Sequence, residues 1–151
     1  METKDNFGDF ELGQFYIPFT KQNVNEFVPR TTGVYMLGVK LDDYLPITPV
    51  YIGRACGEIQ NLCQRTRRYL KVLYGHGGEG EVIDSLLNAI NDTSYWFLSW
   101  KKYTPEEAKD AEYNILKNTN LNLVNATGMG KGCKERAMNN ADKIIKSLYK
   151  N

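Results

Sequence analysis

The chain has 151 residues, of which 42 % are hydrophobic and 12 % aromatic, which fits one globular domain. This composition excludes a largely disordered chain, and the length excludes a small fold that depends on disulfide bonds. With 19 basic and 18 acidic residues, the overall charge indicates no class of partner.

The first 30 residues are rich in aromatic side chains but are interrupted by glycine and proline. We expect residues 1–30 to form an arm that packs on the core, with one short strand at 14–19. Residues 33–41 and 50–55 are β-rich, and the turn residues of 42–49 between them predict an antiparallel hairpin with an enlarged loop.

Two helices and a third strand are predicted after the hairpin. Asn61 is a suitable N-cap for a helix over 61–75, and the apolar spacing of residues 81–91 predicts a second, amphipathic helix. Residues 94–103 alternate aromatic side chains too densely for a surface helix, so we expect a strand there.

The clearest helix start is Thr104, because Pro105 follows at the first helical position and Glu107 completes a capping box. A glycine hinge at 126–132 then leads into a last amphipathic helix over about 134–149. Its expected docking stripe consists of Met138, Ala141, Ile145 and Leu148.

This order of elements, β-β-α-α-β-α, predicts an α+β fold with a small three-stranded antiparallel sheet flanked by helices. An N-terminal arm precedes this unit and a tail helix follows it. We therefore divide the chain into the arm (1–30), a central domain (31–125), and the hinge with the basic tail helix (126–151).

The sequence excludes several kinds of functional site and several cellular locations. No charged start leads into an apolar run and no apolar stretch approaches about 18 residues, so we expect a cytoplasmic protein without a membrane segment. The three cysteines, Cys56, Cys63 and Cys133, lack the spacing of a zinc site, and we expect reduced thiols. The only histidine, His76, lies in a glycine-rich loop that matches no phosphate-binding motif.

Basic residues gather in two stretches of this nearly neutral chain. The second stretch begins at Lys131, and both suit a polyanion bound at limited sites, although solvated helix faces would look the same. The first stretch contains Arg54, Arg65, Arg67, Arg68 and Lys71.

Five short motifs occur in an order that resembles one family. "GVY" at 33–35 and "YIG" at 51–53 fall on predicted strands, and "NLCQRTRRY" at 61–69 falls on the next helix. "EYN" at 112–114 lies on a later helix, with "LVN" at 123–125 after it. Over about residues 31–125 the chain resembles the GIY-YIG nuclease domain.

The resemblance implies a role for each matching residue. Tyr35 and Tyr51 would face the active cleft, Tyr69 would join them from the helix, and Glu112 would bind the metal. The longer connection after Gly53 leaves Arg67 and Arg68 as alternatives to Arg65 for the helix arginine, and we interpret Gly33 as a backbone kink. The implied contacts to phosphate or DNA come from Arg54, Arg65, Arg67, Arg68 and Asn125.

These residue types suit phosphodiester hydrolysis. Negative charge grows on the phosphoryl oxygens in the transition state, and an arginine fork can bind two of them. One carboxylate such as Glu112 suffices for Mg²⁺, or for Mn²⁺ in its place, because the ion keeps most of its waters. Tyrosine is a weak base at its usual pKa, so we expect nearby cations to lower the pKa of Tyr35 or Tyr51.

The resemblance thus implies a Mg²⁺-dependent DNA endonuclease, and the length suggests a compact enzyme of the phage, mobile-element or restriction type. Two alternatives stay open: a non-catalytic nucleic-acid-binding or regulatory module that keeps the fold, and a domain that docks on a protein partner. A homodimer would allow cuts in both strands, but the sequence does not demonstrate one. It also leaves open the cleavage specificity and which tyrosine is the general base.

Overall fold

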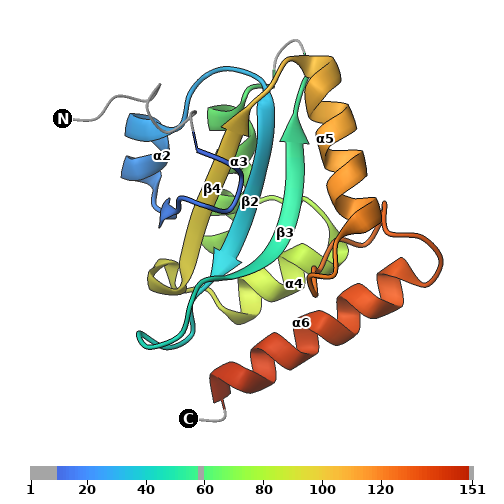
Figure 1. Cartoon of the computed structure of the whole chain (residues 1–151). Helices are drawn as coiled ribbons and strands as arrows, with labels where there is room; N and C mark the ends of the chain where they lie inside the picture. The colour runs from blue at the N-terminus through green and yellow to red at the C-terminus, as the bar shows by residue number, and fades with distance from the viewer. Residues whose placement is uncertain (1–9, 58–59, 150–151) are drawn as a thin grey trace.

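The computed structural model describes residues 10–57 and 60–149 (Figure 1). Ten elements follow one another in these described residues, and all the longer ones predicted from the sequence are present. In chain order they are β1 (Ile17–Pro18), α2 (Lys21–Phe27), β2 (Gly33–Val39), β3 (Thr48–Ala55), α3 (Leu62–Leu73), α4 (Glu81–Ala89), the 3₁₀ turn η1 (Thr93–Tyr95), β4 (Trp96–Lys102), α5 (Pro105–Asn118) and α6 (Cys133–Tyr149).

The sheet is antiparallel and has four strands in the order β1-β4-β2-β3. The expected sheet of three strands was therefore wrong by one. The added strand is the short one of the arm, where Ile17 pairs with Leu98 and Pro18 with Phe97. Proline has no N–H to donate, so this strand stays at the edge of the sheet and is only two residues long.

The arm also contains α2, which the sequence reading missed. Thr20 caps this helix by accepting a hydrogen bond from the N–H of Asn23, and Val24 is fully buried. With seven residues and one buried side chain inside it, the helix has no apolar periodicity to detect.

The predicted helix starts of the central domain are confirmed. Asn61 caps α3 and forms a capping box with Gln64, and Thr104 does the same with Glu107 at the start of α5. These local signals fix where α3 and α5 begin, and thereby the height at which their side chains meet the sheet.

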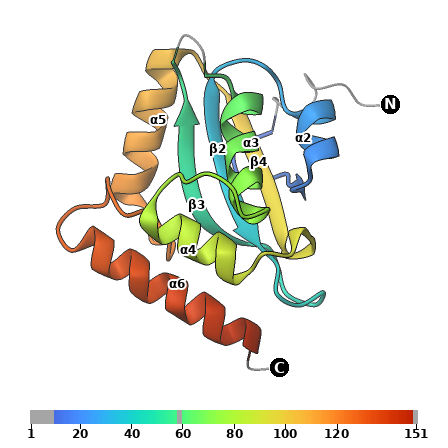
Figure 2. The same ribbon diagram turned by 180° about the vertical axis from the view of Figure 1, so that it is seen from behind.

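Helices cover both faces of the sheet. Val34, Met36 and Ile52 pack with Ala108 and Leu116 of α5 on one face. The other face carries a larger core shared with α2, α3, α4 and α6. Figure 1 shows α5 in front of the sheet beside β3, and Figure 2, from behind, shows α3 and α4 on the opposite side.

The tail helix α6 packs on the same core, mostly through the predicted stripe, but Met138 does not take part. Met138 is 48 % exposed, and Ala137 is buried in its place together with Ala141. Ile145 and Leu148 pack against the core as expected. A stripe at 137, 141, 145 and 148 keeps the helical period, so the error is confined to its first residue.

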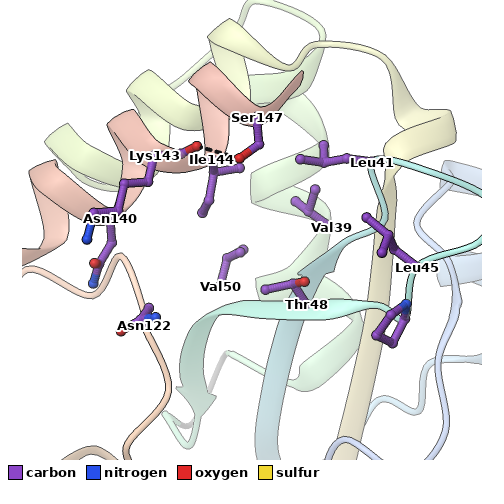
Figure 3. Close-up of a pocket in the computed structure, with 11 residues that line it drawn as sticks. Val39, Leu41, Leu45, Thr48, Val50, Asn122, Asn140, Lys143, Ile144 and Ser147 are labelled. Carbon is purple, nitrogen blue, oxygen red and sulfur yellow. Dashed lines mark hydrogen bonds between the residues drawn. The ribbon is translucent and has the colours of Figure 1, made fainter. Parts of the chain in front are cut away.

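An apolar cavity of about 250 Å³ lies between α6 and the β2–β3 hairpin (Figure 3). Val39, Val50 and Ile144 line it from three different elements.

Within residues 10–57 and 60–149, none of the helices combines the length and apolar character needed to cross a bilayer.

Candidate active site

The two motif tyrosines lie on one face of the sheet, on neighbouring strands. Tyr35 of β2 pairs with Gly53 of β3, and Tyr51 precedes Gly53 by two residues, so both side chains point the same way. Tyr35 is only 1 % exposed, whereas Tyr51 is partly exposed. Of the two phenols, Tyr51 is therefore the one more open to a ligand.

Both motif glycines are required for space. Neither Gly33 nor Gly53 has a positive φ. Gly33 pairs in register with Ala55 and with Lys102, so the strand does not show the expected kink there. A Cβ atom on Gly53 would collide with the phenol ring of Tyr35. One on Gly33 would collide with the backbone carbonyl oxygen of Lys101 in β4. The missing side chain of Gly53 thus lets the ring of Tyr35 lie across β3.

A third tyrosine joins the pair from α3. The hydroxyl groups of Tyr35 and Tyr69 share a buried hydrogen bond of 2.7 Å. The ring centroid of Tyr69 lies 5.6 Å from that of Tyr35 and 5.6 Å from that of Tyr51. Tyr69 itself is fully buried, so it supports the other two phenols from behind.

Arg65 reaches the same phenols from one turn earlier in α3. Its guanidinium carbon lies 5.5 Å from the ring centroid of Tyr69, within range of a cation–π contact. Its Nη1 forms an ion pair of 3.0 Å with Oε1 of Glu79, which lies in the loop between α3 and α4. The side chain of Arg65 is 19 % exposed, and Tyr69 and Glu79 hold it on two sides.

Glu112 arrives from α5, the helix on the other face of the sheet. Its Oε1 accepts a hydrogen bond of 2.9 Å from Nη1 of Arg54 on β3. The side chain of Glu112 is 18 % exposed and that of Arg54 is 41 % exposed. The ion pair uses only one of the two carboxylate oxygens.

One pocket of about 330 Å³ brings these groups together at the outer edge of β3. Side chains from both faces of the sheet reach it, because β3 is the edge strand of the sheet. Its lining consists of Tyr35, Tyr51, Gly53, Arg54, Cys56, Gly57, Gln60, Arg65 and Glu112.

The remaining candidates lie outside this pocket. Arg67 lines a separate hollow with Lys21 and Lys71, on another side of α3. Arg68 is exposed, and its Nε lies 3.8 Å from Glu79. Of the three candidate arginines of α3, Arg65 is therefore the one that lines the pocket.

Asn125 has a different environment from the one expected for a DNA contact. It is 6 % exposed, and its amide accepts a hydrogen bond from the N–H of Ile52 and donates one to the carbonyl of Ile52. Val124 also donates to the carbonyl oxygen of Val50. The segment after α5 thus covers the edge of β3 at Val50 and Ile52, and the contacts of Asn125 are structural.

Burial raises the pKa of all three tyrosines of the cluster. For Tyr35 and Tyr51 the loss of solvent is the largest cause of the raised pKa, and Glu112 acts in the same direction. Tyr69 also raises the pKa of Tyr51, whereas its hydrogen bond with Tyr35 lowers the pKa of Tyr35. Arg65 lowers both pKa values, but by less. The expected lowering of these pKa values by nearby cations is therefore corrected: near pH 7 the phenols are neutral.

The pKa of Glu112 is also raised. Burial is the main cause, and Arg54 opposes it through the ion pair and hydrogen bond. A half-buried carboxylate gains from a nearby cation, because a positive charge favours its ionised form. This chemistry fits a divalent cation at Glu112, where the ion would take its other oxygens from water and phosphate. Among the described residues, no group of three or more acidic, histidine or cysteine side chains is arranged to hold a metal.

Sequence reasoning missed three residues of this region. Cys56 and Gln60 line the pocket, and Glu79 pairs with Arg65. Cys56 and Gln60 both follow the end of the strand that carries "YIG", so their positions in the sequence could have indicated them. Glu79 gave no such signal, because a glycine-rich loop separates it from its partner.

Comparisons of the chain with models of protein families, with curated proteins and with solved structures found no match. The function proposed below therefore depends on the residues and on their geometry.

Proposed function

We propose that the protein is a Mg²⁺-dependent DNA endonuclease that hydrolyses phosphodiester bonds in the pocket at the edge of β3. The observation that carries the proposal is the convergence of Tyr35, Tyr51, Arg54, Arg65 and Glu112 on this pocket. These residues come from two strands and two helices, and their types suit one phosphate group with its metal.

Arg65 is placed to bind phosphoryl oxygens. Its planar guanidinium can donate two parallel hydrogen bonds to one phosphate, and it stays charged at any relevant pH. Because Tyr69 and Glu79 hold it, little rotational freedom is lost when it binds. Arg65 therefore stabilises the negative charge that grows on the phosphoryl group.

Glu112 would hold the metal ion. When bound, Mg²⁺ supplies positive charge next to the phosphoryl and leaving oxygens. Glu112 has a second carboxylate oxygen beyond the one that Arg54 contacts, and Arg54 is exposed enough to turn toward the phosphate.

The neutral phenols act as hydrogen-bonding groups. A tyrosine with a raised pKa is a poor base near pH 7, so it orients the attacking water or donates to a phosphoryl oxygen. Tyr51, which is partly exposed, makes this contact directly, and Tyr35 fixes Tyr69 behind it.

One observation favours a second candidate, a nucleic-acid-binding module without catalysis. Both arginines of the pocket are already paired with an acid, Arg54 with Glu112 and Arg65 with Glu79. In such a pocket, whose charges are already neutralised, the arginines could exchange their carboxylate partners for a phosphate and bind it without catalysing a reaction.

Incubation of the purified protein with supercoiled plasmid separates the two functions. The nuclease proposal predicts nicked or linear products in Mg²⁺ and in Mn²⁺, and none in EDTA. Sequencing gels of the products would then give the cleavage position and the end chemistry. Protein that binds the plasmid in a gel-shift assay, but leaves it intact with both metals, would favour the binding module.

A further inference from the structure

The glycine-rich loop between α3 and α4 places Glu79 next to Arg65, the arginine that α3 contributes to the pocket. Oε1 of Glu79 lies 3.0 Å from Nη1 of Arg65 and 3.8 Å from Nε of Arg68. The side chain of Glu79 is only 11 % exposed. A carboxylate this well buried normally has a charged partner, and here the partner is Arg65.

The position of Glu79 is fixed by the start of α4. Both carboxylate oxygens of Asp84 accept hydrogen bonds of 3.0 Å from the backbone N–H of Glu79. One of them also accepts a bond of 3.2 Å from the N–H of Gly80. Asp84 belongs to the first turn of α4, so the helix anchors the end of the loop. Gly75 and Gly77, with φ of 89° and 77°, let the chain turn into this position.

Glu79 and Tyr69 restrain the guanidinium of Arg65 from two directions. A guanidinium has five N–H donors in a fixed plane, and the contact with Glu79 engages Nη1. Arg65 at the same time lines the pocket with Tyr35 and Tyr51. Fixing one edge of the plane therefore leaves other donors for a ligand in the pocket.

We propose that Glu79 is a positioning residue, whose carboxylate fixes the guanidinium of Arg65 so that its remaining donors bind the oxygens of one phosphate group. The inference rests on the proposed function, since it assigns a phosphate ligand to the same pocket. Donors that are oriented in advance stabilise a transition state without paying for reorganisation during the reaction. The glycine-rich loop that contains Glu79 matches no phosphate-binding motif, but it thus acts on the phosphate through Arg65.

The kinetic test is Glu79→Gln, which keeps the size of the side chain and removes its charge. We expect kcat for DNA cleavage to fall about 10- to 100-fold, the range for a lost charged hydrogen bond, with KM changed less than about threefold. Asp84→Ala, which frees the loop and keeps Glu79, should lower kcat by a smaller factor in the same direction. Glu81→Gln is the matched control, because Glu81 lies beside this loop and pairs only with exposed Lys134. It should leave kcat unchanged.

A second readout does not depend on cleavage. In ¹H–¹⁵N spectra of the wild-type protein, the Nη groups of Arg65 should give separate signals, because the ion pair slows rotation of the guanidinium. In Glu79→Gln these signals should merge, and a titration with inorganic phosphate should shift them with weaker affinity than in the wild type.

Each outcome decides one question. If the spectra and kcat of Glu79→Gln match those of the wild type, the positioning role is overturned. Faster cleavage by this variant would also overturn it, since Glu79 would then compete with the phosphate. If the wild type cuts no DNA while the spectra change as expected, the positioning role is supported and the nuclease proposal fails.

Discussion

At the scale of single residues, the two motif tyrosines have separate tasks. Tyr35 is buried against Tyr69, while Tyr51 opens to the pocket. The sequence predicts both as cleft residues but cannot show this division, because burial depends on what α3 and α5 cover. The raised pKa values follow from the same burial.

Tyr35→Phe tests the supporting task. The change removes the 2.7 Å hydrogen bond to Tyr69 and leaves that buried hydroxyl with one partner fewer. We expect the free energy of unfolding to fall by about 1–2 kcal/mol, measured by urea denaturation. Tyr51→Phe should lower the free energy of unfolding by less than Tyr35→Phe does, and it should lower the cleavage rate by more. An unchanged midpoint for Tyr35→Phe would mean that the buried bond contributes nothing.

The raised pKa of Glu112 predicts the pH dependence of cleavage. A carboxylate must lose its proton to bind Mg²⁺, so cleavage should be complete above this pKa and lost as the pH falls through it. Because burial raises the pKa, the loss should occur at a higher pH than for an exposed glutamate. The measurement is kcat/KM against pH at low Mg²⁺. An acid limb at or below the usual value of about 4.3 would contradict the assignment.

At the scale of elements, the hairpin of β2 and β3 was predictable and its packing was not. Alternating β-formers and turn residues fix the hairpin locally, and the capping residues Asn61 and Thr104 fix two helices. The pairing of β1 with β4 joins residues about 80 positions apart, and only the folded chain brings them together. Glu79 and Arg65 meet through the turn of a glycine-rich loop, which leaves no periodic signal in the sequence.

Gly53→Ala tests the fit of the hairpin around its tyrosine. The added methyl group would occupy the place of the Tyr35 ring, so the ring must move or β3 must shift. We expect a loss of about 1–3 kcal/mol in the free energy of unfolding, with slower cleavage. Gly57→Ala is the stability control, because its Cβ would make only ordinary contacts with Gln60. Equal stability of the two variants would contradict the proposed role of Gly53.

At the scale of the whole molecule, the fold places the candidate residues on both sides of one sheet edge. Arg54 and Arg65 line the pocket at the edge formed by β3, and Arg68 lies near Glu79, the partner of Arg65. Arg67 instead lies with Lys21 and Lys71 near α2. The basic residues that gather in one stretch of the sequence are therefore divided between two surfaces, because successive residues of a helix point in different directions. Charge along the sequence predicted a polyanion partner, and the fold indicates which arginines could meet it.

Under the proposed function, this division predicts which surface DNA would contact. Arg68→Ala should weaken binding to uncut DNA in Ca²⁺ and lower the salt dependence by about one counterion, whereas Arg67→Ala should change neither. Fluorescence anisotropy over a series of salt concentrations measures both. Equal effects of the two substitutions would show that the DNA also covers the side of α3 that faces α2.

The central claim is that Glu112 of α5 and the tyrosines of the hairpin form one catalytic site. It is tested most directly by Glu112→Ala, with Asp110→Ala, an exposed acid on the same helix, as the control. In Mg²⁺ the cleavage rate of Glu112→Ala should fall by about 10²- to 10³-fold while DNA binding persists, and Asp110→Ala should cut at the wild-type rate. A Glu112→Ala protein that cuts DNA as fast as the wild type would contradict the account.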